Sequence, residues 1–350
     1  MRVAFVTATT RHHAAADPDR AARIDGVAQR LAGRGHDVTV LTTRWWETDA
    51  ASITREDVHY RAVADAAGPR FTLGVPWALR AVEPEVTHVV HDDPGVVVAA
   101  AVGGAPVVVD WYDLPADRES AVVTWLRRRA ARGPAMVVTP SRLVQTSVRA
   151  LGRSATGIEV VPTGIEYDLV ESVTPVDRGE IVYSRRLDAD ANLEDLLLAL
   201  AEFRAFDWRA VVIGDGPRRG EYESQARDLR IDDRVEFAGD LPIEERVAAF
   251  KGAHAYVHTA RRSSFPTDLV RALACGCVGI VSYHEQSSAH EFVEATDRGF
   301  LTTSPEEIAD AIEDVGRLPH RTIEESYADY GQDAVLDRYQ RLYETVRSAR

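Results

Sequence analysis

The chain has 350 residues, enough for two domains, and its 45% hydrophobic and 27% charged residues predict a packed globular protein. Its formal net charge is −14, from 55 acidic against 41 basic residues, which argues against a main role in binding nucleic acid. No run approaches the roughly 18 apolar residues of a membrane span. The N-terminal run MRVAFVTATT does not have the pattern of a signal peptide. We therefore expect a cytoplasmic protein, attached at most to the inner face of a membrane.

Basic residues are almost all arginine, because Lys251 is the only lysine. An acidic, lysine-poor surface resembles that of proteins from high-salt cytoplasms, where a Debye length of about 3 Å weakens repulsion between carboxylates. GC-rich codon usage is the alternative explanation. Cys275 and Cys277 lie in an apolar run at a spacing that suits neither a disulfide nor a zinc site. They predict small buried side chains in a reducing compartment.

Apolar, β-rich runs alternate with amphipathic helical patterns along the whole chain. The clearest helix is residues 192–204, where leucines recur at helical spacing. Such alternation predicts an α/β fold with two doubly wound, Rossmann-like domains that face each other across a cleft. The expected strands are Val3–Ala8, Asp37–Thr42, Val86–His91, Pro106–Asp110, Ala135–Thr139, Ile158–Pro162, Glu180–Tyr183, Arg209–Ile213, Arg234–Ala238, His254–His258 and Val278–Ser282.

The alternation pauses over residues 163–178, where periodicity is weak, and this predicts a domain boundary. We expect an N-terminal domain over residues 1–168 and a C-terminal domain over residues 169–320. The remaining segment, residues 321–350, is predicted as a C-terminal helix that packs back on the N-terminal domain.

Three polar segments follow strands of the second half and are candidates for a ligand site. Gly214-Asp215-Gly216-Pro217 permits a sharp turn and close backbone approach, although an ordinary strand-to-helix turn has the same pattern. Residues 259–268 form a polar, basic loop in which Ser264 is expected to cap a helix beginning near Phe265 or Pro266. Uncapped N–H groups beside arginines make an anion site; a capped helix with solvated arginines is the alternative.

The third segment is Tyr183-Ser184-Arg185-Arg186-Leu187 at the end of an expected strand. A guanidinium group in that position can hold a phosphate with a forked pair of donors. A surface ion pair is the alternative.

Taken in order, these segments resemble the nucleotide-sugar domain of the family-4 retaining glycosyltransferases, which have the GT-B fold. The matching text in the second half is Arg186-Leu187, Asn192-Leu193-Glu194, Gly214–Pro217, Asp233–Gly239 and Ala272–Gly276. The first half agrees through Ala21–Val40 and through the hinge-like Val161–Glu166. The resemblance covers nearly the whole chain, and the ordered set is more specific than any one motif.

The resemblance implies transfer of a hexose-type sugar from a nucleotide-sugar donor in the second domain to a glycan or lipid-linked acceptor in the first. It implies no cofactor and no metal, and we expect no nucleic-acid partner. The catalytic candidates are Arg186, Asp268 and Asp113. The donor-binding candidates are Arg185, Arg186, Gly214, Asp215, Gly216, Ser263, Ser264, Phe265, Pro266, Thr267 and Arg271. The acceptor-side candidates are Thr9, Arg11, His12 and Tyr112.

Several positions depart from the family pattern. Ser263 and Arg271 stand where two glutamates are usual, Ala191 replaces the pyrophosphate lysine, and Tyr112 replaces a histidine that precedes Asp113. These losses leave two alternatives open, a non-catalytic binding or partner subunit and a GT-B-fold sugar-nucleotide epimerase. A nicotinamide-dependent dehydrogenase is disfavoured, because residues 8–13 lack the glycine fingerprint.

The arginine-rich segment Trp125–Arg132 stands out in an acidic chain. Val122, Val123, Leu126 and Ala130 are expected to form its inward stripe, with the arginines facing elsewhere. As a hypothesis, this helix contacts an anionic membrane that carries the acceptor. An ordinary solvated helix face is the alternative.

Overall fold

A computed structural model describes residues 1–13, 18–91, 93–114, 120–203, 207–294 and 296–349. The chain divides into two compact units, which are described separately. Unit 1 comprises Met1–Pro162 and Val335–Arg350, and unit 2 comprises Thr163–Ala334. The chain thus leaves unit 1 after Pro162, a few residues before the expected boundary at 168, and returns to it at Val335.

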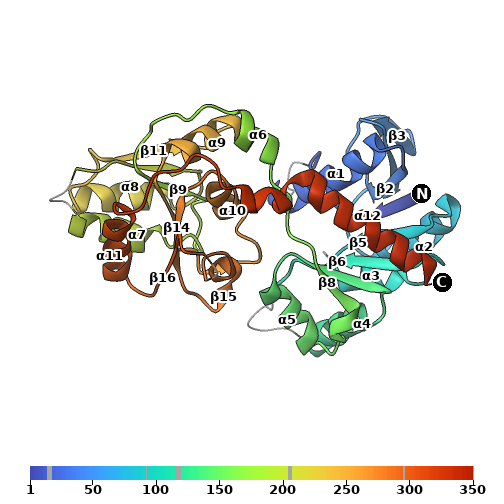
Figure 1. Ribbon diagram of the computed structural model, residues 1–350. Coiled ribbons are helices and arrows are strands. Elements are labelled where there is room, and N and C mark those ends of the chain that lie inside the picture. The colour runs from blue at the N-terminus through green and yellow to red at the C-terminus, as the bar shows by residue number, and fades with distance from the viewer. Residues whose placement is uncertain (14–17, 92, 115–119, 204–206, 295, 350) are drawn as a thin grey trace. The chain divides into compact units, whose positions relative to one another are not determined.

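Unit 1 is built on an eight-stranded sheet in the order β3-β4-β2-β1-β5-β6-β7-β8 (Figure 1). All neighbouring strands run parallel except the β3–β4 hairpin. The strands are β1 (Arg2–Val6), β2 (Asp37–Thr43), β3 (Ser52–Arg55), β4 (Val58–Ala64), β5 (Val86–Val90), β6 (Val107–Asp110), β7 (Met136–Thr139) and β8 (Ile158–Val160). The helices are α1 (Pro18–Gly33), α2 (Pro69–Val82), α3 (Pro94–Ala100), α4 (Ala121–Arg132), α5 (Arg142–Ala150) and most of α12 (Gln332–Ser348).

Helices cover both faces of this sheet. Because successive side chains of a strand point to opposite faces, Phe5 packs in one core with α1 and α12, whereas Val6 packs in another with α2, α3, α4 and α5. Burial on both faces explains why these strands are nearly continuous runs of valine.

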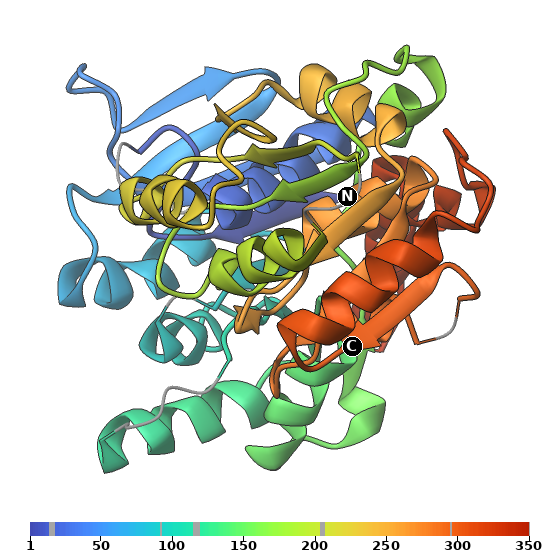
Figure 2. The ribbon, with the colours of Figure 1, turned by 90° about the vertical axis from the view of Figure 1, so that its left-hand side faces the viewer.

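Unit 2 contains a six-stranded parallel sheet in the order β11-β10-β9-β12-β14-β16, which can be followed with its helices in Figure 2. Its strands are β9 (Ile181–Ser184), β10 (Ala210–Ile213), β11 (Val235–Gly239), β12 (Ala255–His258), β14 (Val278–Ser282) and β16 (Gly299–Thr302), and a separate pair joins β13 (Arg262–Ser263) to β15 (Gln286–Ser287). Its helices are α6 (Tyr167–Ser172), α7 (Leu193–Glu202), α8 (Arg219–Asp228), α9 (Ile243–Gly252), α10 (Thr267–Ala274) and α11 (Pro305–Val315).

The prediction of an α/β fold with two parallel, doubly wound sheets is confirmed. The helix expected over 192–204 is described as α7, and Arg204 lies outside the described residues. In the segment 321–350 a 3-10 helix (Glu325–Tyr330) precedes α12, whose buried side chains, including Tyr339 and Tyr343, belong to the core of unit 1. Cys275 and Cys277 are buried with free thiols, and burial raises the pKa of Cys275 to about 12.

The orientation predicted for α4 was wrong in part. Val122 and Val123 are 68% and 39% exposed, and the buried side chains of the helix are Arg127, Ala130 and Ala131. The Arg127 guanidinium lies over the Trp111 ring, 5.4 Å from its centroid. The long aliphatic stem of arginine lets it occupy a core-facing position, which a hydrophobicity pattern does not reveal.

Candidate functional site

The strand order of unit 2 predicts a ligand crevice at the carboxyl ends of β9 and β12. From β9 the chain continues to β10 and β11 on one side, whereas from β12 it continues to β14 and β16 on the other. In open parallel sheets, ligands bind at such a switch point, outside the carboxyl ends of the two central strands. The segments that follow β9 and β12 contain most of the donor-site residues expected from the sequence.

Arg185 directly follows β9 and is the half-buried cation of this crevice. Its Nε is buried and has no hydrogen-bond partner among the described residues. Arg186, the next residue, is exposed. The end of β12 supplies His258 and the loop after β14 supplies His284, and each ring has a buried Nε2 without a partner in the described part of the chain. Burial, followed by the nearby charge of Arg185, lowers the pKa of His258 to about 3, so this imidazole is neutral at pH 7.

The glycine loop after β10 packs against the backbone of the arginine segment. Gly214 has φ 122°, and a Cβ there would lie 2.1 Å from the carbonyl oxygen of Arg185. A Cβ on Gly216 would lie 2.3 Å from the carbonyl oxygen of Leu187. The Asp215 carboxylate accepts a hydrogen bond from the Gly216 N–H at 2.6 Å. The two glycines thus allow this loop to pack closely against the backbone of Arg185 and Leu187.

The segment before α10 differs from the prediction. Ser264 does not cap the helix: α10 begins at Thr267, with Pro266 as a cap that makes no side-chain hydrogen bond. Pro266 has ψ 74°, outside the helical range, so the helix starts later than expected. The Ser264 carbonyl instead accepts a hydrogen bond from the Ser288 hydroxyl at 3.0 Å. Ser263 lies buried in β13, and the Phe265 ring packs against another phenylalanine 5.3 Å away.

A partly buried ionic network lies next to the first turn of α10. The Asp268 carboxylate accepts hydrogen bonds from the Ser184 hydroxyl at 2.5 Å, from Arg246 at 3.0 Å and from Arg271 at 2.7 Å. Burial alone would raise the pKa of Asp268, but the guanidinium groups of Arg271 and Arg246 outweigh it and hold the pKa below its usual value. Both carboxylate oxygens of Asp268 are therefore engaged within unit 2, beside the end of β9.

Arg271 extends this network to the start of unit 2. Its Nε and Nη2 donate to the two carboxylate oxygens of Glu166 at 2.8 and 3.2 Å, and Gln332 donates to the same carboxylate at 3.0 Å. Arg271 was expected to bind the donor, but these contacts occupy its guanidinium within unit 2.

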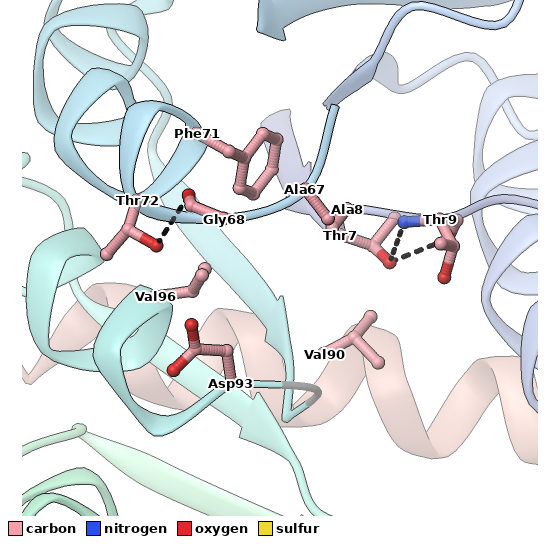
Figure 3. Close-up of a pocket in the computed structure, with 10 residues that line it drawn as sticks. All are labelled: Thr7, Ala8, Thr9, Ala67, Gly68, Phe71, Thr72, Val90, Asp93 and Val96. Atoms are coloured by element: carbon pink, nitrogen blue, oxygen red, sulfur yellow. Dashed lines mark hydrogen bonds between the residues drawn. The ribbon is translucent and has the colours of Figure 1, made fainter. Parts of the chain in front are cut away.

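The strand order of unit 1 has its own switch point, between β1 and β5. From β1 the chain continues to β2, and from β5 to β6, on opposite sides. A pocket of about 220 Å³ lies at this point, between the starts of α2 and α3 (Figure 3). Its lining is mostly apolar, and Asp93, which caps α3 through the Gly95 N–H at 2.7 Å, is the ionisable residue among those that line it. The pocket is lined by Thr7, Ala8, Thr9, Ala67, Gly68, Phe71, Thr72, Val90, Asp93 and Val96.

Of the expected acceptor-side residues, Thr9 lines this pocket and the other three lie elsewhere. Arg11 pairs with Glu56, and its backbone N–H donates to Asp25 at 2.6 Å. The His12 ring stacks on Trp45 at 4.2 Å. The Tyr112 ring lies under the Arg23 guanidinium, 4.7 Å from its carbon.

Asp113 lies near the carboxyl end of β6, next to a histidine that sequence reasoning did not select. The His91 Nδ1 is 2.9 Å from the Asp113 carboxylate, and the His91 ring stacks on Trp111 at 3.6 Å. His91 immediately follows β5, and β5 pairs with β6. Its place at the end of an expected strand was the available sequence signal. The carboxylate of Asp113 is 30% exposed and so remains accessible.

Two protein families match this chain, one in each unit. The family "Glycosyl transferases group 1" matches residues 167–334, and "Glycosyltransferase Family 4" matches residues 21–169. A glycosyltransferase from Rickettsia africae ESF-5 superposes with a TM-score of 0.79 over 99% of this chain and 98% of that one, at 14% identity. The Anabaena protein HepE, in complex with UDP and glucose, gives 0.73 over 99% and 100%, at 16% identity. The chain belongs to the group 1, family-4 glycosyltransferases and has the GT-B fold.

Two curated relatives match part of this chain. The gpi3 subunit of phosphatidylinositol N-acetylglucosaminyltransferase from Schizosaccharomyces pombe is 24% identical over 40% of the chain, and the 2-deoxystreptamine glucosyltransferase of Streptomyces kanamyceticus is 26% identical over 36%. The matched parts are 32% and 36% of those proteins, so the chain spans about a third of each.

The structure shows what surrounds Ala191, one of the positions that depart from the family pattern. Ala191 is fully buried, and its carbonyl accepts hydrogen bonds from Tyr183 at 2.8 Å and Thr259 at 3.1 Å. Arg261, near the same place, bonds to Asn192 at 2.6 Å. Arg185 is half-buried and has no acidic partner among the described residues.

Proposed function

We propose that the chain transfers a sugar from a nucleotide-sugar donor to a glycan or lipid-linked acceptor, with retention at the anomeric carbon. The donor diphosphate is placed in the crevice of unit 2, at the ends of β9 and β12. The acceptor is placed at the carboxyl edge of the unit 1 sheet, near the pocket and Asp113. Peripheral contact of the protein with the inner face of a membrane belongs to the same proposal.

The observation that carries the donor assignment is the set of unpaired nitrogens on Arg185, His258 and His284. A guanidinium Nε without a carboxylate partner in the described chain costs free energy when buried, unless a ligand supplies the acceptor. A diphosphate provides several charged oxygens, and neutral imidazoles can donate N–H groups to them. Such donors stabilise negative charge as it develops on a leaving phosphate. Arg186, exposed beside Arg185, is a further candidate for that charge.

The choice of a nucleotide sugar and of a glycan or lipid acceptor also draws support from relatives. HepE is described in complex with UDP and glucose. The names of the two curated relatives refer to a phosphatidylinositol N-acetylglucosaminyltransferase and to a 2-deoxystreptamine glucosyltransferase. On this basis we include both a lipid-linked and a soluble glycan acceptor in the proposal.

A thermal-shift screen against UDP-, GDP- and ADP-sugars tests donor binding. A ligand at 100 times its dissociation constant should stabilise the fold by about 2.7 kcal/mol. Arg185→Ala should remove the shift, whereas Arg227→Ala, at an exposed position of α8, should keep it. A shift that persists in Arg185→Ala, or no shift with any of the nucleotides from a folded protein, would refute the assignment.

The second candidate function is a non-catalytic subunit that binds a sugar or a partner. Arg271 favours it, because the guanidinium stands where the family has a glutamate and is held by Glu166 and Asp268. Incubation with the donor identified above and a panel of acceptors separates the two. A product with the same anomeric configuration as the donor, measured by NMR, supports retaining transfer. Binding of the donor without turnover supports the non-catalytic subunit. Conversion of the donor without an acceptor supports an epimerase.

A further inference from the structure

One helical layer of unit 1 has a charge opposite to that of the whole protein. The helices α2, α3, α4 and α5 contain eight arginines and no aspartate or glutamate, in a chain whose net charge is −14. The helices on the opposite face of the sheet, α1 and α12, contain both signs of charge. The asymmetry is therefore local to this layer, which we call the basic layer.

The four helices share one packing arrangement. Their buried side chains, among them Phe71 of α2, Val97 of α3, Ala130 of α4 and Val144 of α5, meet in a single core cluster on one face of the sheet. The exposed residues of this layer belong to α2, α4 and α5, whose ribbons can be followed in Figure 1. Of the eight arginines, Arg127 is buried, and the exposed ones are Arg70, Arg80, Arg128, Arg129, Arg132, Arg142 and Arg149.

Several of these exposed cations have no acid to neutralise them. Within the part of the chain that the structure describes, Arg70, Arg128, Arg129 and Arg149 form no ion pair. By contrast, many exposed arginines of unit 2 are paired, as Arg209 is with Asp177 at 2.8 Å. The positive charge of the basic layer is therefore exposed to solvent.

Large apolar side chains accompany these arginines. Leu73 and Trp77 on α2 are each 66% exposed, and Val122 and Trp125 on α4 are 68% and 62% exposed. On α2 the residues Leu73 and Trp77 lie one turn apart, between Arg70 and Arg80. Tryptophan and arginine both combine an apolar body with a polar end, which suits the boundary between lipid headgroups and acyl chains.

We propose that the basic layer binds an anionic lipid surface. Arginines attract anionic headgroups, and the exposed tryptophans, leucine and valine enter the boundary region of the bilayer. The acidic remainder of the protein does not prevent this at physiological ionic strength, because charges more than about 8 Å away are screened. The same remainder fixes the orientation, since other faces are repelled at short range. This inference rests on the peripheral membrane contact of the proposed function and names its surface, but it does not depend on the identity of the donor or on turnover.

Vesicle flotation of the full chain at about 0.1 M salt tests the proposal. The protein should float with phosphatidylcholine vesicles that contain phosphatidylglycerol, and not with phosphatidylcholine alone. Each arginine near an anionic surface contributes about a fivefold increase in partition, so Arg128→Ser with Arg129→Ser should lower it roughly 25-fold. Trp77→Ser with Trp125→Ser should also weaken binding and abolish the blue shift of tryptophan emission that vesicles cause.

The matched control is Arg227→Ser with Arg341→Ser, two exposed arginines on α8 and α12. It changes the net charge equally but lies outside the basic layer, so its partition should stay within about twofold of the wild type by the same scale. Absence of flotation in the wild type, or an equal loss in the control, would overturn the proposal. Binding to duplex DNA or to an acidic polypeptide without binding to vesicles would also overturn it and assign the layer to a polyanion. Far-UV circular dichroism melts verify that each variant is folded.

Discussion

Arg271→Met should destabilise unit 2 by removing the centre of its partly buried ionic network. Methionine keeps much of the aliphatic volume but deletes the hydrogen bonds at 2.7, 2.8 and 3.2 Å to Asp268 and Glu166. The side chains of Arg271 and Asp268 are each 13% exposed, so water replaces little of what is lost.

The size of the effect follows from what each carboxylate retains. Breaking one partner of a buried ion pair costs about 3–5 kcal/mol. Asp268 keeps Arg246 at 3.0 Å, and Glu166 is 27% exposed and can be rehydrated. We therefore expect a loss of about 3 kcal/mol, at the lower end of that range. For a unit of this size that corresponds to a fall of about 6–12 °C in melting temperature.

Differential scanning calorimetry at neutral pH measures the loss, with Arg227→Met as the matched control at an exposed site. The pH dependence gives a second readout. Because the folded pKa of Asp268 is depressed, its contribution to stability is present above the unfolded pKa of about 3.9 and is lost as the pH falls through the folded pKa. Arg271→Met shrinks that depression, so stability should fall less steeply on acidification. A melting temperature equal to that of the control would refute the reasoning.

Two further changes test the supports of the two crevices. Gly214 has φ 122°, and Gly214→Ala places a Cβ 2.1 Å from the carbonyl oxygen of Arg185. We therefore expect a loss of about 1–3 kcal/mol of stability in thermal melts, together with weaker nucleotide binding. The control Gly220→Ala, where no atom lies near the added carbon, should not lower stability. Arg23→Met should cost about 3 kcal/mol in urea unfolding, because the buried Asp110 loses its guanidinium partner and keeps the hydrogen bond from the Tyr339 hydroxyl at 3.0 Å. If adding Asp110→Asn recovers none of this loss, the ion pair is not its cause.

The chain's alternation of apolar runs and helices was sufficient to predict both parallel sheets, because strands covered on both faces are continuous apolar runs. It did not reveal β3 and β4. This hairpin turns at Glu56 and Asp57, which have φ of 52° and 61°. Hairpin turns of that geometry favour asparagine and glycine, so the usual signal was missing. The strands themselves are mixed in polarity, as expected at the edge of a sheet.

The candidate site stays a prediction, and the structure shows which of its residues lie at the ends of β9 and β12. Arg185 and the loop before α10 were identified because they follow strands at the switch point. His258 and His284 were not, because a histidine's role depends on which groups surround it in space. Arg271 was predicted to bind the donor because the sequence does not show its partner. That partner, Glu166, lies far from Arg271 along the chain. The buried face of α4 was predicted wrongly in part because Arg127 packs its aliphatic side chain into the core.

The positions of the carboxylates decide which arginines can bind an external anion. Arg23 is held by Asp110 and Arg271 by Glu166 and Asp268, and these ion pairs stabilise the two units. Arg185 lies in a crevice of unit 2 where no described acid pairs with it, and the arginines of the basic layer lie on helices that contain no acidic residue. We propose two separate anionic ligands for these two places, a diphosphate at the ends of β9 and β12 and lipid headgroups at the basic layer.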